Sequence, residues 1–268
     1  MKELAGGRVL IEELAPYITR ITLNDPDRRN ALDLEMLGAL DAELKELAGS
    51  EIRALILTGA GRAFCAGFNI GRIQSVPKDQ LEAAEERSDS LPISFCRRLE
   101  EFPAATIALL NGHTYGLGGE IAVSCDFRLS WKHGYFGMPP AKLGLCYHSD
   151  GLRKFVDLVG PSIAKEMFFT GEPLTMSQAH EAGLLTHLVE REELEDKVMA
   201  LAQSIAAAAP LAVRNMKRSF GALAKGPGLP EEVQSELRAL ERECFASEDL
   251  MEGRAAFLEK RAPNFKGR

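Results

Sequence analysis

Hydrophobic and polar positions follow two different periods along the first part of the chain. Residues 8–14 and 17–23 alternate with a period of two, which predicts two strands joined at Ala15-Pro16. From about Asp33, leucines recur at steps of three and four residues as far as Leu47, which predicts an amphipathic helix. The chain is therefore expected to open with a hairpin followed by a helix.

Later segments lack this alternation and predict buried strands or helices. The runs at 53–58 and 104–110 are largely apolar, which is typical of strands in the interior of a sheet. Between them, residues 78–99 predict a helix with a break around Pro92. Further strands are expected at 127–131, 135–138 and 184–189, and helices at 152–159, 162–169, 177–182, 192–208, 211–223, 230–245 and 249–261.

Composition narrows the class of protein. The 268 residues suffice for one large domain, or for a domain with an appendage. The net charge is -7, and because the 32 Lys and Arg are scattered among 39 Asp and Glu, we expect no nucleic-acid partner. An anionic ligand would need a local basic pocket.

Targeting and metal signals are missing from the sequence as well. No long apolar leader and no run of about 18 apolar residues occurs, so we expect a cytoplasmic protein with no membrane partner. The five cysteines and five histidines show no metal-ligand spacing, which predicts reduced thiols and no metal site.

The stretch at 111–126, NGHTYGLGGEIAVSCD, holds the first candidate for chemistry. It predicts a helix from about Gly118 that is apolar on every side except for Glu120. A buried carboxylate is costly without a purpose, so Glu120 is a candidate catalytic residue. Gly116 and Gly119 would let the unpaired N–H groups of the helix start face an oxyanion. Equally, the glycines could serve tight packing, and an acid in the first turn could simply complement the helix dipole.

A second informative stretch, GAGRAFCAGFNI, lies at 59–70 after a predicted strand. Its Gly59-x-Gly61 start is similar to a dinucleotide fingerprint, but Phe64 stands at the third glycine position and no helix follows directly. We therefore reject a Rossmann interpretation. An apolar loop with small residues before Phe68 can instead present backbone N–H groups to a cleft.

These stretches together resemble the crotonase superfamily, the enoyl-CoA hydratase/isomerase family of acyl-CoA enzymes. The order and spacing of the motifs over nearly the whole chain carry the resemblance, and no single motif decides it. The motifs are RNAL at 29–32, AFCAGF at 63–68, NG at 111–112, GGE at 118–120, CD at 125–126, Pro139, LG at 143–144, FTG at 169–171, AGL at 182–184, EG at 252–253 and FLEKR at 257–261.

The resemblance implies a fold of the α/β class, a crotonase-like spiral of strands and helices. An acyl-CoA-binding core is expected at residues 1–191, and a helical C-terminal oligomerisation region at 192–268. The implied assembly is a homotrimer or a dimer of trimers. A coenzyme A thioester would bind as the substrate, and no separate cofactor is implied.

The resemblance also assigns site residues. The thioester carbonyl would lie between the backbone N–H groups of Phe68 and Leu117, and each such donor can contribute about 3 kcal/mol of transition-state stabilisation. Leu117 stands where relatives commonly have glycine, which suits a backbone donor if its dihedral angles tolerate a side chain. The implied walls of the coenzyme A site are Arg28, Asn30, Ala31, Arg62 and Ala66, with Phe257 and Lys260 from an adjacent subunit. The alternative for Phe257 is that it is a core residue of the last helix.

The reaction is less constrained, because Glu120 matches one of two catalytic glutamates of the hydratases and the other position holds Pro140. Proline cannot transfer a proton. A single carboxylate beside an oxyanion hole can isomerise a double bond, or can hydrate it with help from Tyr147 or His148 in the polar loop at 142–150. An acyl-CoA-processing enzyme of this type, with Glu120 as the acid/base, is the primary prediction.

Two other interpretations stay open. Leu143-Gly144 and Tyr147 resemble the loop of methylmalonyl-CoA decarboxylase relatives, although Asn69 follows Phe68 where those relatives carry a histidine, and Glu120 would repel an anionic substrate. The third interpretation is a family member that binds acyl-CoA or RNA without turnover. The retained buried acid and the acidic composition disfavour it.

Overall fold

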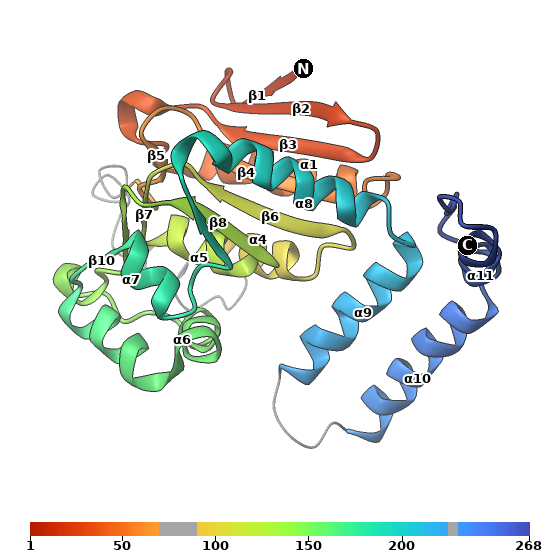
Figure 1. Cartoon of the computed structure of the whole chain (residues 1–268). Helices are drawn as coiled ribbons and strands as arrows, with labels where there is room; N and C mark the ends of the chain where they lie inside the picture. Colours follow the sequence, from red (N-terminus) through yellow and green to blue (C-terminus); the bar gives the residue numbers. More distant parts are fainter. Residues whose placement is uncertain (70–89, 225–229) are drawn as a thin grey trace.

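A computed structural model describes residues 1–69, 90–224 and 230–268, and its strands form two sheets. The strands are β1 Lys2–Leu4, β2 Val9–Ala15, β3 Ile18–Leu23, β4 Ala54–Gly59, β5 Ala63–Cys65, β6 Ala105–Leu110, β7 His113–Tyr115, β8 Phe127–Trp131, β9 Tyr135–Gly137, β10 Leu174–Thr175 and β11 His187–Val189. The larger sheet has the order β1-β2-β3-β4-β6-β8-β11, and the smaller has the order β10-β9-β7-β5 (Figure 1). From β3 to β11 the larger sheet is parallel, so the carboxyl ends of these strands share one edge.

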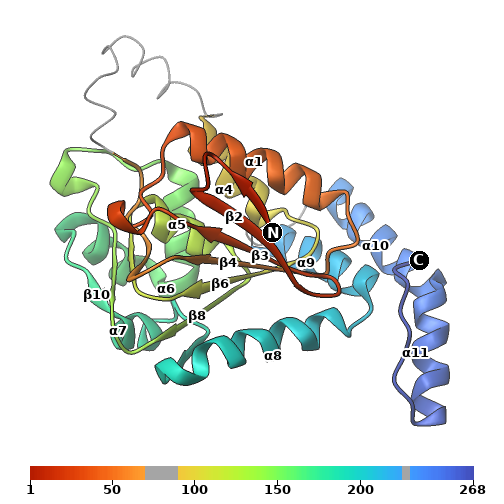
Figure 2. The same cartoon turned by 90° about the horizontal axis from the view of Figure 1, so that it is seen from above.

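Helices cover both faces of the larger sheet. They are α1 Leu34–Ala48, α4 Leu91–Glu100, α5 Leu117–Ser124, α6 Ser149–Thr170, α7 Met176–Glu181, α8 Leu194–Ala206, α9 Pro210–Leu223, α10 Glu231–Ala246 and α11 Glu248–Glu259, with short 3-10 helices η1 Pro26–Arg28, η2 Ala141–Leu143 and η3 Arg191–Glu193. The pair α1 and α4 lies on one face, and α8 crosses the other (Figure 2). In contrast, α10 and α11 extend away from the sheet.

The central strands are buried on both sides, as their apolar runs predict. Leu55 and Leu57 of β4 join the core cluster that contains residues of α1 and α4, whereas Ala54 and Ile56 pack with residues of α8. Every residue of β4 and of β6 is buried. Burial from two sides fixes the sheet rigidly, and the loops that leave its carboxyl edge are therefore well supported.

Most predicted elements are confirmed, and the differences have local causes. Pro92 lies in the first turn of α4, where proline is well tolerated, so it begins that helix and does not break it. Residues 78–89 of the predicted helix lie outside the described residues. The helices expected at 152–159 and 162–169 are the two halves of α6, which bends at Gly160 with φ 75°. The strands β1, β5, β7 and β10 were not expected from the sequence.

The C-terminal helices are attached to the body mainly through α8 and α9. On α9, Lys217 Nζ donates to the carboxylate of Asp126 at 2.8 Å and to the carbonyl of Ala104 at 3.0 Å. The division predicted at residues 191 and 192 stays a prediction, since α8 follows it and still covers the sheet. No single helix within the described ranges is long and apolar enough to cross a membrane; Arg191–Ala206 and Pro210–Leu223, bent by 105°, pass that test of length and composition only as a pair.

Candidate active site

The loop that follows β5 meets the first turn of α5 at the edge of the smaller sheet. Gly67 has φ +93°, and a Cβ atom added to it would lie 2.8 Å from the carbonyl oxygen of Tyr115 and 3.3 Å from the nitrogen of Leu117. Only glycine permits this approach. An added Cβ at Gly118 would likewise lie 2.6 Å from Cys65, so the helix start packs directly on β5. Both expected roles of the glycines, close packing and access to the helix start, are therefore present.

Two backbone N–H groups are left without partners where these segments meet. Phe68 forms a parallel bridge with Leu32, in which Leu32 N donates to Gly67 O and Asn69 N donates to Leu32 O, each at 2.8 Å. The N–H of Phe68 therefore faces away from Leu32. Leu117 is the first residue of α5, so its N–H has no acceptor within the helix. In the part of the chain that the structure describes, neither N–H donates a hydrogen bond to another residue.

Leu117 keeps ordinary helical geometry. It is not one of the non-glycine residues with positive φ, so its side chain is accommodated without backbone strain. The dihedral angles of Leu117 therefore tolerate a side chain, as a backbone donor at this position requires.

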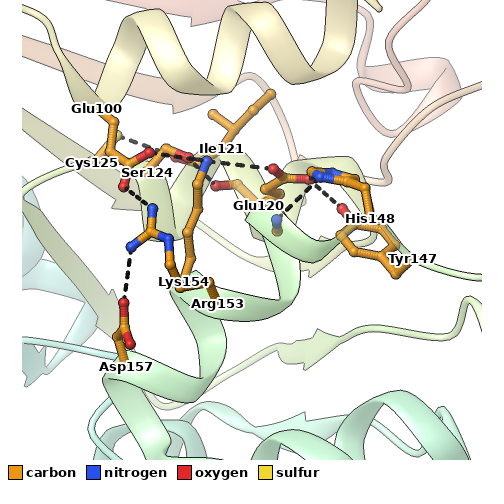
Figure 3. A network of polar contacts seen from close by, with 11 residues as sticks. Glu100, Glu120, Ile121, Ser124, Cys125, Tyr147, His148, Arg153, Lys154 and Asp157 are labelled. Carbon is orange, nitrogen blue, oxygen red and sulfur yellow. Dashed lines mark hydrogen bonds and ion pairs between the residues drawn. The ribbon is translucent and has the colours of Figure 1, made fainter. Parts of the chain in front are cut away.

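Glu120 lies one turn further along α5 and is 1% exposed. Tyr147 Oη donates to its Oε2 at 2.5 Å, and His148 Nε2 lies 3.0 Å from the same oxygen (Figure 3). The backbone N–H of Gly151 donates to His148 Nδ1 at 3.1 Å. Because Nδ1 accepts, we assign the proton of the neutral ring to Nε2, which then donates to Glu120.

The surroundings of Glu120 favour its ionised form. Burial by itself raises the pKa of Glu120, but the hydrogen bond from His148, the charge of Lys154 and the hydroxyl of Tyr147 together bring that pKa below its ordinary value of 4.5. Burial and the neighbouring Glu120 charge raise the pKa of Tyr147 well above its ordinary value, so the phenol stays protonated and donates. The site therefore holds a carboxylate anion surrounded by donors.

Lys154 is a member of this site that sequence reasoning missed. Its Nζ lies 2.8 Å from Ser124 Oγ and 3.4 Å from Glu120 Oε1, and its side chain is 4% exposed. A signal was present: Lys154 shares one stripe of α6 with Gly151 and Phe155, three residues before it and one after it, and all three are buried. A lysine inside an apolar stripe indicates a buried partner.

The side chain of Asn30, a residue predicted to line the coenzyme A site, holds the loop between β4 and β5. Its Nδ2 donates to the carbonyl oxygens of Ala60, Ala63 and Phe64, and its Oδ1 accepts from Asp25 N. The residue is fully buried. Its side-chain amide is therefore engaged within the protein, and its predicted place in the wall of a coenzyme A site stays a prediction.

The other residues expected around coenzyme A fall into two groups. The first group consists of Arg28, Ala31, Arg62 and Ala66. Its members lie together because the backbone N–H of Ala66 donates to the carbonyl of Arg29 at 2.9 Å and the loop before Arg62 packs on η1. Arg28 and Arg62 are exposed, as phosphate ligands need to be. Phe257 and Lys260 lie at the end of α11, far from this group in Figure 1.

Phe257 is 84% exposed, so a core position for it within this chain is wrong. Its predicted place beside a neighbouring subunit's ligand stays a prediction.

Pro140 is buried and carries no proton to transfer. Its carbonyl accepts from the N–H groups of Leu143 and Leu145, which shapes the loop that leads to Tyr147.

Among the described residues, no group of three or more His, Cys, Asp or Glu side chains is arranged to hold a metal ion. The chemistry that this arrangement offers is proton transfer by Glu120, beside two unpaired backbone donors.

Comparison with known proteins points in one direction. The family model "Enoyl-CoA hydratase/isomerase" matches residues 14–268. A short-chain-enoyl-CoA hydratase of Clostridium acetobutylicum is 34% identical, with 97% of this chain and 98% of the relative covered. The methylmalonyl-CoA decarboxylase of Escherichia coli is 32% identical, with 92% and 94% covered. The crystal structure of an enoyl-CoA hydratase from Bacillus anthracis superposes with a TM-score of 0.90 at 29% identity, covering 97% of this chain and 100% of that one. The expected α/β crotonase-like fold is thus confirmed.

Proposed function

Because this chain belongs to the enoyl-CoA hydratase/isomerase family, we propose that it moves protons at the carbons beside the thioester carbonyl of an enoyl-CoA, with Glu120 as the acid/base. It is an acyl-CoA-processing enzyme of the enoyl-CoA hydratase/isomerase type. One observation carries the choice of residue: Glu120 is a buried carboxylate in the first turn of its helix, three residues after the unpaired N–H of Leu117.

In this proposal the thioester carbonyl accepts from the N–H groups of Phe68 and Leu117. Negative charge develops on that oxygen when a proton leaves the neighbouring carbon. Each donor is fixed before the charge appears and contributes about 3 kcal/mol to the stability of the enolate. The positive end of the α5 dipole acts in the same sense.

Glu120 then serves as the base, and its protonated form returns the proton. Isomerisation of a double bond needs only this one group, since the same proton leaves one carbon and arrives at another. Hydration needs a second proton carrier, and Pro140 cannot supply it. His148 is the candidate for that role, because its Nε2 lies 3.0 Å from Glu120 and its side chain is 27% exposed.

The proposal is tested with a panel of crotonyl-CoA, a 3-enoyl-CoA and methylmalonyl-CoA, with products identified by mass spectrometry. We expect turnover of an enoyl thioester: conversion of the 3-enoyl substrate to its 2-enoyl isomer for an isomerase, and addition of water to crotonyl-CoA for a hydratase. Carbon dioxide release from methylmalonyl-CoA with no turnover of either enoyl thioester would overturn the proposal.

Decarboxylation is the second candidate, and the structure offers one observation in its favour. Two features disfavour it, Asn69 at the position of a histidine and repulsion between Glu120 and an anionic substrate, and Lys154, 3.4 Å from Glu120, offsets the second. Tyr147, which donates to Glu120, would then be placed near the carboxylate that is lost.

The proposed coenzyme A site is formed by Arg28, Ala31, Arg62 and Ala66 of one subunit, and by Phe257 and Lys260 of a neighbour in a homotrimer or dimer of trimers. Exposed Arg28 and Arg62 support phosphate binding in an otherwise acidic protein. A member of the family that only binds acyl-CoA or RNA would show binding with no turnover across the whole panel.

A further inference from the structure

We propose that Lys154 is a positioning residue for Glu120. It anchors one carboxylate oxygen, Oε1, and so fixes the orientation in which the other oxygen, Oε2, meets Tyr147 and His148. The inference rests on the proposed role of Glu120 as the base.

The amine of Lys154 lies among three oxygen atoms of other side chains. An ammonium group has three donors, and three acceptors surround this one: Ser124 Oγ at 2.8 Å, Glu120 Oε1 at 3.4 Å and Glu100 Oε2 at 3.5 Å. Ser124 donates its own hydroxyl proton to the backbone carbonyl of Glu120 at 2.8 Å, so it must accept from Lys154. Lys154 therefore presents a fixed positive charge to Glu120.

The two oxygens of Glu120 have different surroundings. Oε1 faces Lys154, whose side chain is 4% exposed. Oε2 faces Tyr147 and His148, and His148 is 27% exposed. The carboxylate is thus held by Lys154 at one oxygen and by Tyr147 and His148 at the other, and His148 is the partially exposed member of the three (Figure 3).

Other groups around Glu120 cannot replace this charge. Cys96 faces it from α4, and Glu100 of the same helix pairs with Lys154. Ser124 and Cys125 lie at the end of α5, and Tyr147 and His148 face Glu120 from the segment before α6. His148 contacts Glu120 through Nε2 while its Nδ1 accepts from Gly151, and Glu100 is an acid. Arg153 is engaged with Glu100 at 3.1 Å and Asp157 at 2.9 Å. Among the described residues in this network, Lys154 is the lysine or arginine that forms an ion pair with Glu120.

The test is the pH dependence of kcat/KM in the full-length protein. A base must be ionised, so kcat/KM falls as the pH drops through the pKa of Glu120. Lys154→Met removes the charge and keeps an unbranched side chain, and we expect it to move this acid limb upward by about one to three pH units. Lys154→Arg should leave the limb in place. The matched control is Lys165→Met, an exposed lysine on the same helix, which should change nothing.

Glu100→Gln provides a second, opposite test that does not remove a buried group. It deletes a negative charge near Lys154 and Glu120, so the acid limb should move downward. If Lys154→Met does not fold, this variant decides alone. A limb that stays in place in Glu100→Gln, or a Lys154→Met variant that loses the same factor of kcat/KM at every pH, would show that Lys154 is merely structural.

Failure of the proposed function is separable from failure of this inference. If the wild type turns over no acyl-CoA, the pKa of the Glu120 carboxyl is measured directly, by ¹³C NMR titration of the wild type, Glu100→Gln and Lys154→Met. Shifts of that pKa in the stated directions support the positioning role without any turnover, and an unchanged pKa overturns it.

Discussion

At the scale of single residues, the site depends on groups whose hydrogen bonds are all made within the protein. Asn30 is the clearest case, since its amide joins three carbonyl oxygens of the loop before Gly67 to the turn at Asp25. Gly67 then brings that loop against Leu117. The unpaired N–H of Phe68 is thus positioned by residues that carry no chemistry themselves.

Asn30→Asp should weaken the fold strongly. The substitution replaces a donor by an acceptor opposite three carbonyl oxygens, in a fully buried place. We expect the free energy of unfolding to fall by about 3 kcal/mol or more, measured by urea titration. Gln203→Glu, the same change of amide to acid at an exposed position of α8, is the control. Equal stability of the two variants would contradict the role of Asn30.

Gly67→Ala should separate catalysis from general stability. A Cβ there meets the carbonyl of Tyr115 and displaces the loop from Leu117, so we expect kcat to fall by about 100-fold, as for loss of one oxyanion donor. Gly6→Ala is the control, because Gly6 also has positive φ, +66°, but an added Cβ meets nothing within 4 Å. If both variants keep wild-type kcat, the loop does not support the reaction.

Single residues were predictable where the pattern itself is unusual. Glu120 was found because an acid interrupts an otherwise apolar helix, and its burial is confirmed. Lys154 was missed because a lysine on an amphipathic helix usually faces solvent. Its burial depends on how α4, α5 and α6 pack against one another, and that packing involves contacts distant in sequence.

At the scale of elements, the number of residues in a strand or helix determines whether the sequence predicts it. The hairpin, α1 and the buried strands β4 and β6 are long enough to show a period or a continuous apolar run. The strands β5, β7 and β10 contain two or three residues each, too few for either signal. These short strands carry the loop and the helix start at the site, so its geometry could not follow from periodicity.

Arg53 connects three elements at the other end of the molecule. Its guanidinium donates to the carbonyl of Ala206 at the end of α8, at 2.9 Å, and to that of Phe265 in the C-terminal tail, at 2.8 Å. The group also lies 4.1 Å from the ring centroid of Tyr17. It therefore joins the start of β4 to the helical region.

Arg53→Ala should release the tail. Loss of two charged hydrogen bonds is expected to lower the free energy of unfolding by about 2 kcal/mol and to expose residues after 259 to proteases. Lys197→Ala, at an exposed position of α8, should change stability by less than about 0.5 kcal/mol. A tail that stays resistant to limited proteolysis in Arg53→Ala would show that the contacts are dispensable.

At the scale of the whole molecule, the last helices expose apolar side chains that a single chain does not cover. Phe220, Phe245, Met251, Phe257 and Leu258 are each between 65% and 84% exposed. Apolar groups on this scale mark contact with another molecule. The sequence could indicate amphipathic helices here, but whether they pack on their own sheet or elsewhere depends on the tertiary arrangement.

Sedimentation equilibrium should therefore give the mass of three or six chains. Phe257→Asp together with Leu258→Asp places charge on this surface and should shift the protein toward single chains. The same variant should bind coenzyme A more weakly if Phe257 completes a neighbour's site. A wild type that sediments as a single chain at assay concentrations would contradict the assembly.

In the proposed reaction, Glu120 moves the proton at an acyl-CoA bound beside Phe68 and Leu117. The decisive variant is Glu120→Gln, which keeps the shape of the side chain and removes the titrating group. We expect kcat on the enoyl-CoA substrate to fall by at least about 100-fold, because a positioned acid/base contributes about 100- to 10,000-fold. Calorimetry with a non-reactive acyl-CoA should show a dissociation constant within about threefold of the wild type. Undiminished turnover by Glu120→Gln would remove Glu120 from the mechanism.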